Sequence, residues 1–190
     1  MGWVGVVWGP ELDAIERLAP VWSRHAIDDQ GPYARATPFD VMLGGEVLPG
    51  DVEWSTLGAR VLAWSVDQRT LLDPPTPPAV AMVSLMRRNP ALTHDAFVAH
   101  WRDRHGPLAL RRHVGLVEYR QGVVAANLTP DAPDAPEIDG VAQLGFSTRI
   151  DFETRFFDSD EGRAEIMADV ARFMDRPGPE TTLVGPPRSH

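Results

Sequence analysis

The sequence of 190 residues contains no cysteine and no lysine. Without cysteine the chain can form no disulfide, thiolate nucleophile or cysteine-ligated metal centre, which fits a reducing compartment. Without lysine it can form no Schiff base and lacks the lysine of a Walker-type phosphate loop. All 18 basic residues are arginine, so histidines, carboxylates and arginines are the main groups left for chemistry.

Long apolar runs and excess positive charge are also missing. No stretch of about 18 uninterrupted apolar residues and no secretory leader is visible, so we expect a cytoplasmic protein without a membrane partner. The 27 acidic residues leave a net charge of −9, which disfavours nucleic acid as a partner. With 43% hydrophobic residues and six tryptophans the chain can still bury a core.

Cofactor motifs are absent as well. The sequence has no G-x-G-x-x-G dinucleotide motif and no G-x-S-x-G nucleophile elbow. No spacing of His, Asp and Glu indicates a metal site. We therefore expect neither a metal nor an organic cofactor.

Prolines divide the chain at residues 73–78 (DPPTPP), which form a stiff linker. Apolar periodicity predicts the other elements, with Thr93 as a helix N-cap. The expected strands are 3–8, 39–43, 60–66, 79–88, 116–124, 141–147 and 181–185, and the expected helices are 10–27, 94–105, 150–157 and 160–174. After the linker the order is β-α-β-β-α-β, an α+β domain of the ferredoxin-like kind over 79–190. Because such a sheet carries helices on one face only, something must cover the other face.

Four segments of this domain carry a resemblance to a known family. They are MRRNPALTHDAFVAHWRDRHGPLA (86–109), GLVEYRQ (115–121), DGVAQLGF (139–146) and FFDSDEGRAEIMADVARFMD (156–175). Together they resemble an EthD-type domain of the dimeric α+β barrel superfamily, over about residues 79–185. The resemblance implies that two ferredoxin-like halves pack sheet to sheet around an apolar cavity. Its relatives include cofactor-free monooxygenases, isomerases, cyclases, dehydratases and decarboxylases, besides haem-binding branches, so the family alone does not fix the reaction.

The N-terminal residues 1–72 allow two interpretations. They repeat the strand, helix and strand pattern, and Trp22-Ser-Arg-His25 is similar to Trp101-Arg-Asp-Arg-His105. As a degenerate ferredoxin-like half they would complete the barrel within one chain. Otherwise residues 1–78 decorate a domain that forms a homodimer.

His105 is the leading catalytic candidate, because the resemblance places its signature histidine there. Phe97, Trp101 and His105 are four residues apart and share one face of a helix, which we expect to end at Gly106-Pro107. His105 would then project into the cavity as a general acid or base, or as an oxyanion donor. The alternative is a structural histidine that bonds a carbonyl at the helix end.

The other candidates are His100 and Tyr119 for catalysis, and Trp101, Phe97, Arg87 and His25 for substrate binding. His100 is rotated by about 100° from Trp101, so it either faces the pocket or lies on the surface. Tyr119 either bonds a substrate carbonyl or packs its ring in the core. Arg87 ends a strand and could bind a carboxylate or make a surface ion pair. His25 matters only if the N-terminal repeat is real.

These residues predict a cofactor-independent lyase, isomerase or cyclase. Its substrate would be a small or polycyclic apolar carbonyl compound, such as a polyketide or aromatic intermediate, from which His105 moves a proton. One alternative is a cofactor-free monooxygenase of the anthrone-oxidising kind. Others are a haem or small-molecule binding protein without turnover, and a catalytically inactive barrel used for assembly.

Overall fold

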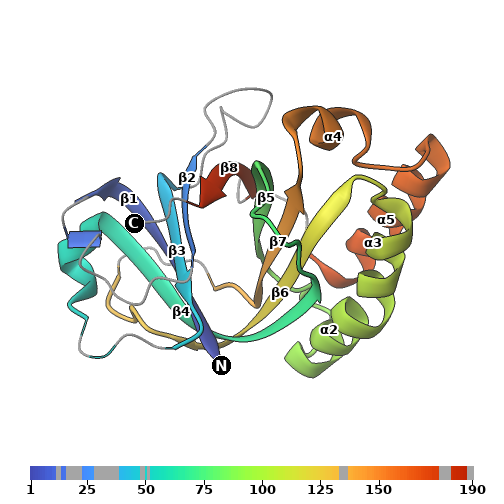
Figure 1. Ribbon diagram of the computed structural model, residues 1–190. Coiled ribbons are helices and arrows are strands. Elements are labelled where there is room, and N and C mark those ends of the chain that lie inside the picture. Colours follow the sequence, from blue (N-terminus) through green and yellow to red (C-terminus); the bar gives the residue numbers. More distant parts are fainter. Residues whose placement is uncertain are drawn as a thin grey trace.

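The structure is a computed structural model, and it describes residues 1–11, 14–15, 23–27, 39–47, 50, 52–132, 137–175 and 181–187. In this part of the chain, eight antiparallel strands form one closed barrel (Figure 1). The strands are β1 (Gly2–Pro10), β2 (Ser23–Ile27), β3 (Val41–Gly45), β4 (Gly58–Leu72), β5 (Val80–Met86), β6 (Leu116–Asn127), β7 (Gly140–Phe146) and β8 (Thr181–Pro187). The proline-rich segment 73–78 lies between β4 and β5.

The two groups of four strands have the same internal order. Around the barrel the strands follow β1-β3-β2-β8-β5-β7-β6-β4. The first four strands follow the order β4-β1-β3-β2, and the last four follow the order β8-β5-β7-β6. Both have the strand order of a ferredoxin-like sheet. The chain therefore closes its barrel without a second copy, through the β4–β6 and β2–β8 pairs. A homodimer stays a prediction, as does the division of the chain into two domains.

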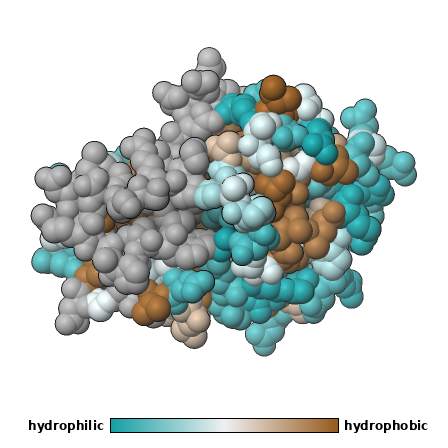
Figure 2. All heavy atoms as spheres, viewed as in Figure 1, coloured by the Kyte–Doolittle hydropathy of each residue, from teal (hydrophilic) through white to brown (hydrophobic). Residues whose placement is uncertain are grey.

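The helices of the second half lie outside the barrel (Figure 1). They are α2 (His94–His100), α3 (Gly106–Arg112), α4 (Arg149–Thr154) and α5 (Asp160–Phe173), and the π-helical turn η3 (Trp101–His105) joins α2 to α3. A short 3-10 helix, η2 (Trp54–Leu57), precedes β4. Hydrophilic residues dominate the outer surface of this helical side (Figure 2). No helix of the described residues is both long and apolar enough to span a membrane.

Side chains of β6 alternate between two separate layers. Tyr119 and Val123 belong to the cluster beneath the helices, with Trp101 and Phe173. Arg120 and Gly122 instead line the barrel interior. Because side chains alternate across a strand, one strand supplies both layers. A third cluster, around Trp3 and Leu43, covers the outside of the N-terminal strands.

The helix expected over 94–105 is confirmed at its start and wrong at its end. Thr93 accepts a hydrogen bond from the backbone N–H of Ala96 and caps α2 as predicted. The helix does not stop at Gly106-Pro107, however, but continues to Arg112. In η3 the N–H of Gly106 reaches the carbonyl of Trp101, five residues back. This wider turn accommodates a proline ring that a regular α-helix would exclude.

The helix expected over 10–27 is wrong at its C-terminal end, because residues 23–27 form β2 and pair with β3 and β8. Barrel closure requires a strand at this position, and that long-range pairing overrides the helical spacing of the local sequence. The middle of the expected helix, with Pro20, lies outside the described residues.

Candidate active site

His105 lies at the end of η3 and faces helix α5. Its Nδ1 donates a 2.9 Å hydrogen bond to Oδ2 of Asp169, and its ring packs on Phe173 with centroids 4.9 Å apart. His105 and Asp169 are each only 8% exposed. The expectation that His105 points into the hollow between the two sheets is therefore corrected, because its helix packs on the outer face of the barrel.

His100 holds the second oxygen of the same carboxylate. Its Nε2 donates to Oδ1 of Asp169 over 2.9 Å, and its ring stacks on Phe173 at 5.0 Å. Residues five apart lie about 140° apart around a regular α-helix, which would separate the two histidines. The π-helical turn closes i to i+5 bonds and brings both histidines to one side. His100 is thus a partner of His105 rather than a surface residue.

The carboxylate fixes which nitrogen of His105 is available. Burial alone raises the pKa of Asp169, but the hydrogen bonds from His100 and His105 outweigh burial and hold it below its ordinary value. Burial lowers the pKa of His105, although Asp169 opposes this shift. An ionised Asp169 accepts the Nδ1 proton, so the neutral imidazole carries its lone pair on Nε2. No described residue bonds Nε2, and this arrangement suits a general base oriented by a carboxylate.

Because two histidines are buried, we predict that the protein loses stability in mild acid. Burial lowers the pKa of His105 and of His113, whose ring bonds the carbonyl of Phe156. The unfolded chain, with histidine pKa values near 6.5, then binds more protons than the folded chain as pH falls below 6.5. We expect the free energy of unfolding to fall from pH 7.5 to 5.5. Each of the two histidines contributes at most about 1.4 kcal/mol to this fall for each pH unit. Urea denaturation at the two pH values measures this, and His113→Gln should weaken the dependence. A free energy that is unchanged or higher at pH 5.5 would contradict the prediction.

Tyr119 lies on the helix side of β6, next to Trp101. Its hydroxyl oxygen accepts hydrogen bonds from Trp101 Nε1 at 3.2 Å and Gln121 Nε2 at 3.0 Å. Burial raises the pKa of Tyr119 to about 12, although these two bonds oppose the shift. The hydroxyl therefore stays protonated at neutral pH and has its own hydrogen to donate.

Asp169 and Gln121 are the site residues that sequence reasoning missed. Gln121 Nε2 also donates to the carbonyl of Trp101, the group that accepts the π-turn bond. Its Oε1 is buried and unpaired among the described residues. The one signal for Asp169 was a carboxylate four residues before Phe173 on a predicted helix face, which does not reveal its histidine partners.

The remaining candidates do not form one site. Phe97 is fully buried beneath α2 and packs on Trp101 at 5.6 Å. Arg87 is exposed at the end of β5. His25 lies on β2, where the structure does not describe its side chain. Both roles assigned to Arg87 and His25 stay predictions.

Two cavities among the described residues lie near this half of the molecule, and His105 lines neither. One is inside the barrel, and the other is an open groove beside α2 and η3 that includes His94, Arg102 and Val123. Within the described ranges no three His, Asp or Glu side chains come together as ligands for a metal ion. The Asp169 carboxylate with its two histidines therefore lies apart from both of these cavities.

The sequence of this helix and sheet unit matches a known family. Residues 89–177 match the family model of the EthD domain. This segment is similar to EthD domains. The match confirms the resemblance predicted from the sequence, and it includes His100, His105 and Asp169.

One solved structure extends the likeness of fold beyond residues 89–177. An anthrone oxidase-like protein of 9% sequence identity has a TM-score of 0.59, with 100% of this chain and 90% of that chain covered. A proposed monooxygenase from Lactobacillus acidophilus NCFM, of 8% identity, has a TM-score of 0.48, with 97% and 91% covered. No curated protein sequence matches the chain. At these identities the first structure shows a shared fold alone.

Proposed function

We propose that this protein is a cofactor-independent oxygenase for a small aromatic carbonyl compound, with His105 as its base. The observation that carries the proposal is the buried His105–Asp169 pair, in which a carboxylate holds Nδ1 and leaves Nε2 unbonded by any described residue. Burial also keeps the imidazole neutral near pH 7, which a base requires. The similarity to EthD domains and the fold shared with an anthrone oxidase-like protein support oxygen as the second reactant.

The reaction begins with transfer of a proton to His105 Nε2 from a CH₂ group that is conjugated with the carbonyl through an aromatic ring, as in anthrone. The substrate carbanion then gives its electrons to dioxygen and forms a carbon–oxygen bond, which yields a peroxide. Return of a proton and loss of water leave a new carbonyl, so that a CH₂ group and O₂ become C=O and H₂O. Asp169 stabilises the imidazolium formed in the first step, and His100 fixes the orientation of Asp169.

Tyr119 would bind the substrate oxygen. Its protonated hydroxyl can donate to a carbonyl on which negative charge develops as the proton leaves carbon. Trp101 and Gln121 donate hydrogen bonds to the oxygen of that hydroxyl and fix its position. Because His105 is almost fully buried, we propose that α3 and α5 move apart to admit the substrate.

A lyase, isomerase or cyclase would share the proton transfer and differ in the later steps. The same pair of residues serves both reactions, and only the oxygenase consumes oxygen. The comparisons favour the oxygenase. No observation on the described residues favours the haem-binding protein. The small interior cavity, and the position of His105 outside both described cavities, are what an inactive barrel would show.

Oxygen consumption tests the proposal directly. With anthrone as the probe, we expect the protein to consume one O₂ for each anthraquinone formed, without added metal, flavin or haem. An oxygen electrode and product chromatography measure the two quantities. Conversion of carbonyl substrates without oxygen uptake would support a lyase instead, and an absence of turnover across a panel of anthrones and related ketones would contradict an oxygenase.

A further inference from the structure

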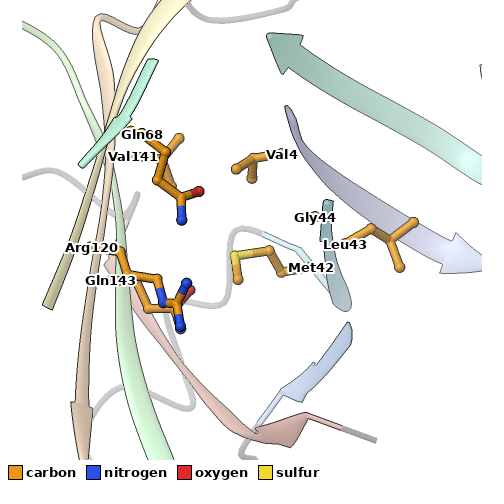
Figure 3. Close-up of a pocket in the computed structure, with 9 residues that line it drawn as sticks. Val4, Met42, Leu43, Gly44, Gln68, Arg120, Val141 and Gln143 are labelled. Atoms are coloured by element: carbon orange, nitrogen blue, oxygen red, sulfur yellow. The ribbon is translucent and has the colours of Figure 1, made fainter. Parts of the chain in front are cut away.

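The barrel interior contains a small cavity whose two walls differ in chemistry. Polar side chains enter from β4, β6 and β7, and apolar side chains face them from β1 and β3 (Figure 3). The polar residues are Gln68, Arg120 and Gln143, and the apolar residues that face them are Val4 and Met42. Val141 of β7 adds one apolar side chain to the polar wall. Since barrel interiors of this size are usually filled with side chains, such a polar wall calls for a partner.

Gln143 presents an acceptor to this cavity. The residue is only 5% exposed, and its Nε2 donates over 2.5 Å to Oε2 of the buried Glu118. Because an ionised carboxylate only accepts, the amide nitrogen must face Glu118 and the oxygen Oε1 must face away. That oxygen has no partner among the described residues. An occupant of the cavity should therefore donate a hydrogen bond.

The charges around the cavity are balanced by carboxylates. Arg120 Nε donates to Glu118 over 2.9 Å, and its Nη2 donates to Asp73 over 2.8 Å. Arg120 is the charged residue in the described lining, and these two ion pairs offset its charge. A carboxylate ligand would have no hydrogen to offer the Gln143 oxygen. Gln68, whose amide has no partner among the described residues, can both donate and accept. A hydroxyl group satisfies Gln143 as a donor and Gln68 as an acceptor.

Met42 controls how large this occupant can be. The cavity leaves about 20 Å³ for the centre of a water-sized molecule. This volume is enough for about one water. Met42 projects into the space from β3 (Figure 3), and its unbranched side chain can change rotamer at small cost. Gly44 and Gly122 add no side chains to the lining. Rotation of Met42 would therefore enlarge the cavity next to the polar wall.

From this geometry we propose that the barrel interior is a binding site for a small uncharged hydroxyl compound, with Met42 as its gate. The site lies on the opposite face of β6 from Tyr119, so it is separate from the His105 site. The hydroxyl bonds Gln143 and Gln68, and the apolar body of the ligand packs on Val4 and Val141.

Methyl NMR with phenol as the probe tests this site. In the protein labelled at its methionine methyl groups, phenol should shift the Met42 resonance, assigned by its loss in Met42→Ala. We expect a Kd of about 1 mM, and binding about tenfold tighter in Met42→Ala because the variant removes the gate. Benzoate, which is charged, and benzene, which has no hydroxyl, should bind at least about tenfold more weakly. Absence of a Met42 shift in the wild type together with absence of phenol binding to Met42→Ala would overturn the proposal.

Two variants locate the effect. Gln68→Leu removes an unpaired amide and should weaken phenol binding without leaving a buried partner unsatisfied. His105→Ala should leave phenol binding unchanged. The interior site is therefore tested independently of the proposed reaction. Equal binding of phenol, benzoate and benzene would show that the polar wall does not select the ligand, and would also overturn the proposal.

Discussion

Replacement of His105 by alanine should lower kcat/KM for oxygen-dependent turnover of anthrone by about 10² to 10⁴-fold. That range is the usual contribution of a positioned general base. Activity of the wild type should rise with pH through the pKa of His105, which burial places below 6.5, and then level off, because only the neutral imidazole takes a proton. Steady-state oxygen uptake across pH 5 to 8 measures both effects.

Two further variants separate the base from its surroundings. Asp169→Asn keeps the shape of the side chain but can donate to Nδ1 of His105, which would move the proton to Nε2 and block the base. His94 makes a matched control, because it also bonds an aspartate, Asp139, at 3.1 Å and lies apart from Asp169. We expect His94→Ala to retain wild-type turnover. Full activity in a folded His105→Ala protein would remove the proposed mechanism.

Replacement of Trp101 by alanine should lower the free energy of unfolding by about 3 to 5 kcal/mol. The indole is 1% exposed, packs on Phe97 and donates to Tyr119. Its ring also lies directly over Gly140, where a Cβ would come within 2.6 Å of Trp101. The alanine variant therefore leaves a large cavity between helix and sheet and an unpaired tyrosine oxygen lone pair.

Urea denaturation followed by far-UV circular dichroism measures this loss without relying on tryptophan fluorescence. Trp54→Ala is the matched control, because this indole is only partly buried and contacts Trp3 from outside the barrel. We expect its cost to stay below about 2 kcal/mol. Equal losses for the two variants would mean that Trp101 does not anchor the helix layer.

The sequence was sufficient to predict most strands and the capped start of α2, because these features depend on local periodicity and on Thr93. It could not predict the π-turn, since the alignment of His100 with His105 depends on the fit of Pro107 and on a hydrogen bond from Gln121 on another element. It could not predict the partner of His105 either, because Asp169 lies 64 residues away along the chain.

The direction in which His105 points was the main error about the site. Helical spacing correctly placed Phe97 and Trp101 on the buried face, yet a helix on a barrel buries its apolar face against the outside of the wall. Side-chain periodicity indicates that a face is buried, but it does not distinguish the two sides of a sheet. Only the strand order, which depends on long-range pairing, makes that distinction.

Because one polypeptide supplies both curved sheets, dilution cannot separate them. In a barrel made from two identical chains, every substitution appears in both halves. This protein can instead keep a histidine and aspartate cluster under one set of helices while the opposite half changes freely. A barrel built from one chain can thus specialise its two sides for different tasks.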